Sequence, residues 1–417
     1  MKSYNHLYEE YISDENFPLA VRNATLHKSG NKRKYRKAKY LREHQDELKP
    51  ELMDYAANFY NDEHFPQTIY DGVRRKQRTI IVPTMREQVI HHMVINVLKP
   101  IFMRSMYECS YGSIPGRGAT RGIYKLHGAK ARGKKRSKRR KCTRGGKEDI
   151  ESFIKWHPKD CKYCMKLDIH KYFESIPHEI LKDKFRKLIH DERFLNILLT
   201  IVDANGQDRG IPIGFYTSQW FANFYLTEFD HYVKEVLGAK AYYRYMDDMV
   251  FFDSNKRRLR RMLYEINTFL RDRLGLELNP KWQIFLFHYI KNDGTEVGRF
   301  LDFMGFRFYR NRTTLRRTLM LRATRKARKL AKKKRKTIHD CRQMLSYKGW
   351  ISATDTYGMY KKWIKPFVSF RYLRKYESAY SKRKSEVKQN VVQERKWQSG
   401  QTGCAGHGIQ QDLRLCS

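Results

Sequence analysis

Two adjacent aspartates, Asp247 and Asp248, constrain the fold of this chain more than any other feature. They follow a run of tyrosines and precede an apolar run, a pattern that predicts strand, tight turn and strand with the acids at the tip of a β-hairpin. Two ionised carboxylates side by side repel each other unless a cation lies between them. We expect this cation to be Mg²⁺, because Mg²⁺ takes oxygen ligands and shares its coordination shell with phosphates.

A third acid, Asp168, ends a predicted strand over residues 163–169 and precedes an aromatic pair. Alone, it would be interpreted as a surface or capping acid, and a tyrosine shortly before two aspartates recurs by chance. A glycine- and proline-containing loop at 210–214 and a predicted helix separate it from the paired acids. Acids on a strand end and on a neighbouring hairpin can converge on two Mg²⁺ ions, which activate a 3′-hydroxyl and stabilise a leaving pyrophosphate. The ordered set therefore indicates nucleotidyl transfer.

The chain carries a large positive charge. Lys and Arg number 86 against 44 acids, which gives a formal net charge of +42. Nucleic acid is the partner that neutralises such a charge, and we prefer it to a protein that is merely basic. Aromatic residues make up 14% of the chain, which suits stacking on bases. The sequence has neither a long apolar run nor an apolar signal core, so we expect a cytoplasmic protein that does not span a membrane.

Basic residues concentrate in two segments. Residues 128–150 form a low-complexity run that predicts a flexible insertion, an electrostatic arm on RNA or DNA, with a nuclear signal as the rival interpretation. After Arg310 the chain becomes basic and helical, and such a helix suits the backbone of a duplex. Its candidate contacts are Arg322, Arg325 and Lys333, and a solvated helix is the alternative.

Seven cysteines, an odd number, imply free thiols. Cys161 and Cys164 are spaced as a CxxC pair, which His157 and Cys142 could complete as a zinc site. No second CxxC is present in the sequence, and Cys164 alternates with Lys166 on a predicted strand. A buried structural cysteine is therefore the preferred interpretation.

In order and spacing, these motifs resemble those of the reverse transcriptases over roughly residues 70–310. The resemblance implies an α+β, right-hand polymerase with fingers, a palm built on an antiparallel sheet, and a helical thumb. It also implies RNA-directed DNA polymerase activity with two Mg²⁺ ions, for which Mn²⁺ is expected to substitute. Asp168, Asp247 and Asp248 match the catalytic acids, and the metal ligands would be these acids together with Ile169.

The resemblance also assigns residues to the incoming nucleotide. Phe173, five residues after the first catalytic acid, falls at the steric gate, where an aromatic ring clashes with a ribose 2′-hydroxyl and selects dNTPs. Arg78, in a β-branched predicted strand, matches the residue that contacts the triphosphate, and Lys281 lies near the pyrophosphate. The implied nucleic-acid contacts are Arg117, in the template segment 110–118, and Gly305, in the primer grip 303–306.

The loop at 210–214 departs from most of the family, which carries Pro-Gln-Gly there. Ile213 stands at the glutamine position, and Ser218 and Gln219 follow, with Gln219 counted among the nucleotide-contacting residues. This loop resembles that of the reverse transcriptases of bacterial and phage diversity-generating retroelements. Glutamine in the family packs under the nascent base pair, and isoleucine offers no hydrogen bond there, so error-prone copying is expected. Core packing beneath the site is the rival interpretation of Ile213.

We expect four parts in the chain. Continuous helices are predicted over 177–201, over 218–237 with Thr217 or Ser218 as the cap, and over the basic segment 316–338, and a single strand over 303–309. The four parts are an N-terminal helical extension (1–70), fingers and palm (71–308, with the insertion 128–150), a basic helical thumb (309–384) and a disordered tail (385–417).

The implied partners are an RNA template, a primer, dNTPs and, for the retroelement subgroup, a small basic accessory protein. Two other functions stay open. An antiviral-defence or other mobile-element reverse transcriptase would have the same chemistry. A non-catalytic RNA-binding scaffold would need no acids, and the presence of all three disfavours it. Retron and group II intron enzymes match less well, because of Met246, the changed loop and the short C-terminal region.

Overall fold

The computed structural model describes residues 3–26, 32–71, 76–120, 123–125, 140–142 and 144–383. The chain divides into two compact units, Met1–Thr313 and Thr314–Ser417. Most of the expected insertion at 128–150 and the expected tail at 385–417 lie outside the described residues. The end of the insertion was predicted wrongly, because helix α6 (Gly146–Trp156) already begins there and its first two residues are buried.

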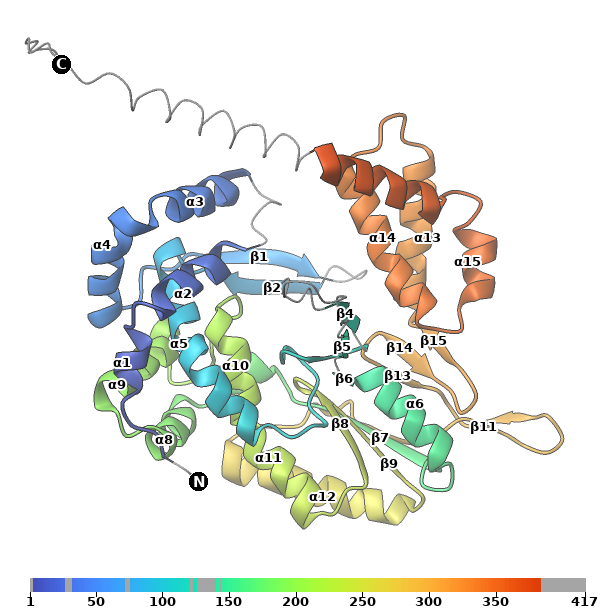
Figure 1. The fold of residues 1–417 in the computed structure, drawn as a ribbon. Coiled ribbons are helices and arrows are strands. Elements are labelled where there is room, and N and C mark those ends of the chain that lie inside the picture. The colour runs from blue at the N-terminus through green and yellow to red at the C-terminus, as the bar shows by residue number, and fades with distance from the viewer. Residues whose placement is uncertain are drawn as a thin grey trace, which may run out of the picture. The chain divides into compact units, whose positions relative to one another are not determined.

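A four-stranded antiparallel sheet forms the centre of the first unit (Figure 1). The expected strand ending in Asp168 and the expected hairpin that carries the paired acids are both confirmed. They lie side by side in the sheet, although about 80 residues of sequence separate them. The strand order is β10 (Gln283–Leu286), β7 (Tyr163–Asp168), β9 (Asp248–Asp253) and β8 (Ala241–Tyr245).

Helices cover both faces of this sheet. The Phe153 ring of α6 contacts Tyr243 and Phe252, whereas Phe229 of α11 (Thr227–His231) contacts Tyr242. Because side chains alternate along a strand, α6 and α11 lie on opposite faces. Helix α12 (Lys256–Leu274) packs against β9 and β10. Asp248 shares its face with Phe252, so the acid lies on the face that α6 covers further along the strand.

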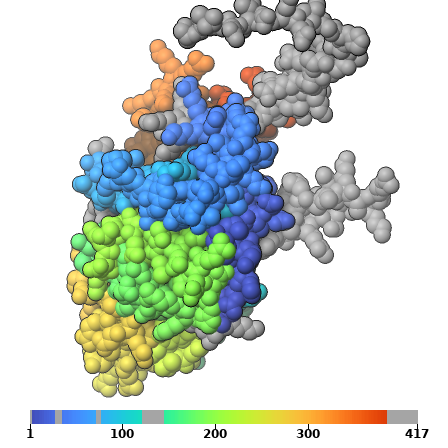
Figure 2. Space-filling model, turned by 90° about the vertical axis from the view of Figure 1, so that its left-hand side faces the viewer, coloured from blue at the N-terminus to red at the C-terminus, as the bar shows by residue number. Residues whose placement is uncertain are grey.

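Helix α5 (Met85–Ser105) is the centre around which the N-terminal part packs. It begins with a capping box, in which Thr84 and Glu87 exchange hydrogen bonds with each other's backbone N–H. Figure 2 shows the N-terminal helices, in blue, lying against the green segment that contains α8 and α9. The N-terminal elements are α1 (Leu7–Tyr11), α2 (Asn16–Thr25), α3 (Lys32–Glu43), α4 (Gln45–Ala57), and the hairpin β1 (Pro66–Asp71) and β2 (Lys76–Ile81).

The two helices predicted as continuous in this unit are broken. The first divides at Asp191, whose carboxylate caps the second half by accepting a bond from the Phe194 N–H at 3.2 Å. The second begins earlier than predicted, so Thr217 and Ser218 lie inside it as buried residues rather than as caps. The resulting elements are α8 (His178–Leu188), α9 (Glu192–Val202), α10 (Tyr216–Tyr225), α11 and a π-helical turn (Tyr232–Val236).

The strand predicted over 303–309 is in fact a hairpin. Strands β13 (Leu301–Phe303) and β14 (Phe306–Phe308) pair antiparallel around a two-residue turn. Met304 and Gly305 both have positive φ, 49° and 88°, as this kind of hairpin turn requires. The remaining short strands are β3 (Arg117–Gly118), β4 (Ile123–Lys125), β5 (Arg140–Cys142), β6 (Arg144–Gly145), β11 (Tyr289–Ile290), β12 (Glu296–Val297) and β15 (Thr313–Leu315).

The second unit is helical. The single basic helix predicted over 316–338 is wrong in its extent, because a second capping box, made by Thr337 and Asp340, starts a new helix. Its elements are α13 (Arg317–Ala331), α14 (Ile338–Ser352) and α15 (Tyr357–Trp363). None of the helices in the described part of the chain is both long and apolar enough to cross a membrane.

Candidate active site

The sheet register brings the three predicted acids together. Asp168 lies directly opposite Asp248 on neighbouring strands, and Asp247 occupies the two-residue turn between β8 and β9. Met246, the other turn residue, has φ 58°, a left-handed conformation that is costly for a side chain of this size. Arg244 holds the turn in this conformation by donating from Nη1 to the Met246 carbonyl at 3.0 Å. The hairpin tip that carries Asp247 is therefore held in place by a side chain of β8.

A neighbouring segment also fixes the tip. Residues 109–111 pair with β8, since the Tyr111 N–H donates to the Arg244 carbonyl and the Arg244 N–H donates to the Cys109 carbonyl, both at 2.9 Å. Gly112 follows, and a Cβ there would lie 2.6 Å from Cγ of Met246. Only glycine fits this approach without moving the turn. The segment predicted to contact the template thus supports the hairpin that carries Asp247 and Asp248.

A buried ion pair lies beneath the hairpin. The Arg244 guanidinium donates to both carboxylate oxygens of Asp230, from Nε at 2.7 Å and from Nη2 at 2.5 Å, and neither side chain is exposed. The Tyr242 hydroxyl donates to the same carboxylate at 2.7 Å. Sequence reasoning missed this set, because an isolated arginine in a strand and an aspartate in an apolar helix carry no motif.

The environment of the acids disfavours the ionised form of Asp247 and orients Asp168. Burial, together with the negative charges of Asp168 and Asp248, raises the pKa of the Asp247 carboxyl to about 6. Asp168 is held by Asn279, whose Nδ2 donates to Oδ2 at 3.0 Å and whose backbone N–H donates to the Asp168 carbonyl at 2.7 Å. The sequence did not indicate this contact between Asn279 and Asp168.

The donor chemistry of the three acids suits a hard divalent cation. All their side-chain ligands are carboxylate oxygens, and a positive charge beside Asp247 would stabilise the ionised form of its carboxylate. Asp248 instead forms an ion pair with Lys166, whose Nζ lies 3.2 Å from Oδ2. Among the described residues, no three His, Cys, Asp or Glu side chains are already gathered as a metal-binding group. The acids therefore fit Mg²⁺ by chemistry, and a lysine accompanies one of them.

Residues expected around the nucleotide are joined by the backbone. The Ile211 N–H donates to the Phe173 carbonyl, and the Ile81 N–H donates to the Ile213 carbonyl, both at 2.8 Å. The loop therefore connects Phe173 to strand β2, which carries Arg78. Gly214 has φ 127°, and a Cβ there would lie 2.1 Å from the Ile81 carbonyl oxygen, so glycine is required. Arg78, Gln219 and Lys281 are exposed.

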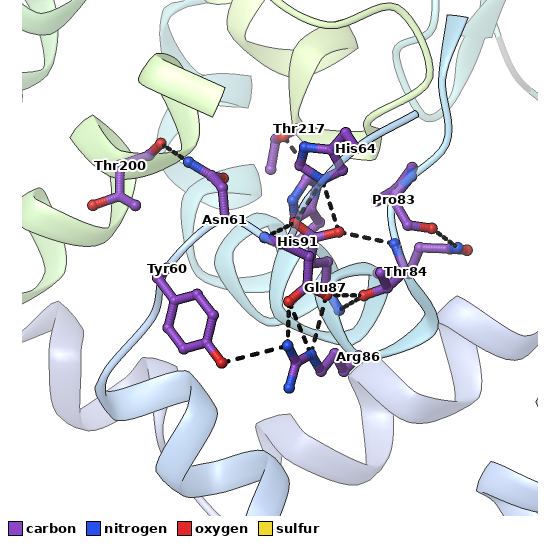
Figure 3. A network of polar contacts seen from close by, with 12 residues as sticks. Tyr60, Asn61, His64, Pro83, Thr84, Arg86, Glu87, His91, Thr200 and Thr217 are labelled. Atoms are coloured by element: carbon purple, nitrogen blue, oxygen red, sulfur yellow. Dashed lines mark hydrogen bonds and ion pairs between the residues drawn. The ribbon is translucent and has the colours of Figure 1, made fainter. Parts of the chain in front are cut away.

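A buried polar network supports this loop from the side of α5 (Figure 3). Phe215 lies between two histidines, with ring centroids 5.1 Å from His64 and 4.6 Å from His91. His64 Nε2 contacts the fully buried Glu87 carboxylate at 2.8 Å, and His91 Nδ1 contacts the Thr217 hydroxyl at 3.2 Å. Burial lowers the pKa of His91 to about 3, so this imidazole stays neutral. These residues fix the loop that carries Ile213, and no sequence motif indicated them.

The residues assigned to nucleic acid have contacts within the protein. Arg117 donates to the carbonyls of Met106, at 3.2 Å, and of Tyr107 at the end of α5. Lys333 forms an ion pair with Asp340 at 2.7 Å. Gly305 lies in the β13–β14 turn, Arg322 is half-buried and Arg325 is exposed. Their contacts with template and primer stay predictions.

The CxxC cysteines are buried thiols. Burial raises the pKa of Cys161 to about 12 and also raises that of Cys164, which lies on β7. Both are free thiols. The preferred interpretation, a structural cysteine on a strand, agrees with this placement; the side chain of Cys142, the other candidate ligand, lies outside the described residues.

Comparisons with known proteins identify the family of this chain. The sequence model of the family described as "Reverse transcriptase (RNA-dependent DNA polymerase)" matches residues 68–340. Protein YkfC of Escherichia coli is 23% identical over 180 residues, which cover 40% of this chain and 40% of YkfC. The chain thus spans less than half the length of this curated relative. Telomerase from Candida albicans, in complex with a fragment of telomeric RNA, has 12% identity and a TM-score of 0.40, covering 76% of this chain and 61% of that one.

Proposed function

The chain belongs to the reverse transcriptase (RNA-dependent DNA polymerase) family, and from that premise we propose that it copies RNA into cDNA with low fidelity, as the polymerase of a diversity-generating retroelement. Its activity is that of an RNA-directed DNA polymerase, and its fold is the α+β right hand of that family. The subgroup proposal rests on one observation, the isoleucine at position 213 where most members carry glutamine.

Each residue of the site has a role in this proposal. Two Mg²⁺ ions, when bound, would activate the primer 3′-hydroxyl and neutralise the leaving pyrophosphate. Asp168 and Asp247, with Asp248, would hold them, and Asn279 orients Asp168 through its two hydrogen bonds. Phe173 would exclude the ribose 2′-hydroxyl of an NTP. Ile169, Arg78, Lys281 and Gln219 are proposed to contact the metal or the nucleotide.

The wider organisation is proposed on the same basis. Residues 71–308 would form fingers and palm, and 309–384 the thumb, with Arg322 and Arg325 on a template–primer duplex. The excess of positive charge supports binding of an RNA template and a primer. A small basic accessory protein is the further partner proposed for the retroelement subgroup.

Low fidelity follows from the chemistry of Ile213. Its side chain is half-buried, and its carbonyl is already bonded to Ile81, so the backbone of the loop is fixed. An isoleucine side chain has neither donor nor acceptor for the bases above it. A mispair beside it therefore leaves no polar group of the loop unsatisfied, and correct and incorrect pairs differ less in free energy.

We expect Ile213→Gln to lower the misincorporation frequency about fivefold, because one hydrogen bond contributes on the order of 1 kcal/mol to discrimination. The measurement is primer extension on a defined RNA template, followed by deep sequencing of the cDNA. Ile290→Gln, on the exposed face of β11, makes the same change away from the loop and should leave errors unchanged. Equal error spectra for wild type and Ile213→Gln would contradict the low-fidelity proposal while leaving the polymerase activity intact.

A further inference from the structure

A lysine ammonium stands among the catalytic acids. Nζ of Lys166 lies 3.2 Å from Oδ2 of Asp248 and donates a hydrogen bond to the carbonyl oxygen of Asp302 at 2.8 Å. Asp302 lies 136 residues further along the chain, on strand β13. The same ammonium lies 5.9 Å from the ring centroid of Phe303. One side chain therefore joins the catalytic hairpin to the β13–β14 hairpin.

The register of the sheet explains this placement. Lys166 pairs with Val250 on β9, and Asp168 pairs with Asp248, so Lys166 is the diagonal neighbour of Asp248. Residues two apart on a strand share a face, which puts Lys166 on the face of the acids. The side chains of Lys166 and Asp248 are 27% and 28% exposed, so water screens this ion pair only in part. The contact is set by the fold of two central strands.

The contact between Lys166 and Asp248 changes the net charge of the acids. Asp168 lies opposite Asp248 on the neighbouring strand and Asp247 precedes Asp248 in the turn, so the three acids share one end of the sheet. Asp248 has the lysine, which reduces the net negative charge of the acids by one. The positive charge of Lys166 would therefore oppose a divalent cation held at Asp248.

We propose that Lys166 is a positioning residue that fixes Asp248 against the β13–β14 hairpin and opposes binding of the divalent ion at that acid until the ion displaces it. The proposal depends on the polymerase activity of the family and not on the retroelement subgroup. Lys166 touches neither substrate nor product in this role. It sets where Asp248 stands and how tightly the acids bind metal.

The two functions of Lys166 predict opposite effects of its removal. Lys166→Met removes the positive charge and keeps a side chain of similar length, so divalent ions should bind more tightly by about tenfold, which corresponds to ~1.4 kcal/mol. The same variant loses the contact with Asp302, so extension at saturating metal should slow by about tenfold or more. A residue that only stabilised the fold would weaken metal binding and activity together.

The experiment measures Mn²⁺ binding to the full chain by calorimetry without nucleic acid, and primer extension as a function of Mn²⁺ concentration. Lys166→Arg keeps the charge and should retain the metal affinity of wild type. Lys166→Gln keeps a donor for the Asp302 carbonyl without the charge, so it should bind Mn²⁺ more tightly and remain faster than Lys166→Met. Lys162→Met, an exposed lysine outside the site, is the matched control.

Unchanged or weaker Mn²⁺ affinity in Lys166→Met would overturn the proposal, as would wild-type extension rates at saturating metal. If Lys166→Met does not fold, Lys166→Gln decides, because its Mn²⁺ affinity tests the charge alone. The binding measurement requires no DNA synthesis. If the variants bind Mn²⁺ as expected but the wild-type protein extends no primer, the enzyme assignment is contradicted. The competition between Lys166 and the metal would still hold.

Discussion

Asp247→Asn is expected to abolish primer extension on an RNA template, with a fall in rate of about a thousandfold or more. Metal ions contribute several kcal/mol of transition-state stabilisation in phosphoryl transfer, and each ~1.4 kcal/mol corresponds to a factor of ten. The amide that replaces the carboxylate keeps the shape of the turn and removes one negative charge from the acids. The measurement is single-turnover extension with saturating dNTPs and Mg²⁺.

The same variant carries its own test of folding. The pKa of Asp247 is about 6 in the folded chain against an ordinary value of 3.8, so the folded state favours the protonated form. Above pH 6 the ionised carboxylate destabilises the metal-free fold by an amount on the order of 3 kcal/mol, and this penalty disappears as the pH falls toward 3.8. Asp247→Asn should therefore raise the thermal midpoint of metal-free protein at pH 8 and not at pH 4.

Asp272→Asn is the matched control for Asp247→Asn. Asp272 is an exposed acid on α12 that pairs with its neighbour Arg271, and its change should leave extension and unfolding unaltered. An inactive Asp247→Asn that is also less stable at pH 8 would mean that the acid supports the fold rather than the chemistry. Retained extension would exclude Asp247 from catalysis.

The acids could be predicted from sequence because their signal is local. Strand alternation and a two-residue turn are enough to place Asp247 and Asp248 at a hairpin tip, and the ordered motifs add Asp168. Lys166 lies two residues before Asp168, so the sequence also predicts that both side chains lie on the same face of the sheet. The partner of Lys166 could not be predicted, because the Asp302 carbonyl is 136 residues away and its position depends on the tertiary fold.

The errors have a common physical origin in capping and turn geometry. Apolar periodicity continues through Asp191 and through Thr337, but both side chains satisfy N–H groups at the start of a new helix. At Met304 and Gly305, the β-rich pattern concealed two positive φ angles. Glu87 and His91 gave no sequence signal, because a buried polar residue is recognisable only once its partners are known.

The Arg244–Asp230 pair gives the second large prediction. Asp230→Leu is expected to destabilise the chain by about 3–5 kcal/mol, because it leaves a fully buried guanidinium without its carboxylate. Arg244→Met should cost a similar amount, since it leaves the carboxylate buried. Urea unfolding of each variant measures the change in the free energy of unfolding.

The double variant, Asp230→Leu with Arg244→Met, separates stability from positioning. Removing both charges should recover most of the lost stability, because apolar replacements of a buried pair are often close to neutral. Extension should stay impaired, since Arg244 also donates to the Met246 carbonyl beside Asp247.

The exposed pair Arg271–Asp272 is the control, and its removal should change stability by less than about 1 kcal/mol. Strictly additive losses in the double variant would mean that the two buried charges do not stabilise each other. Full recovery of extension would mean that Met246 keeps its left-handed conformation without the hydrogen bond from Arg244.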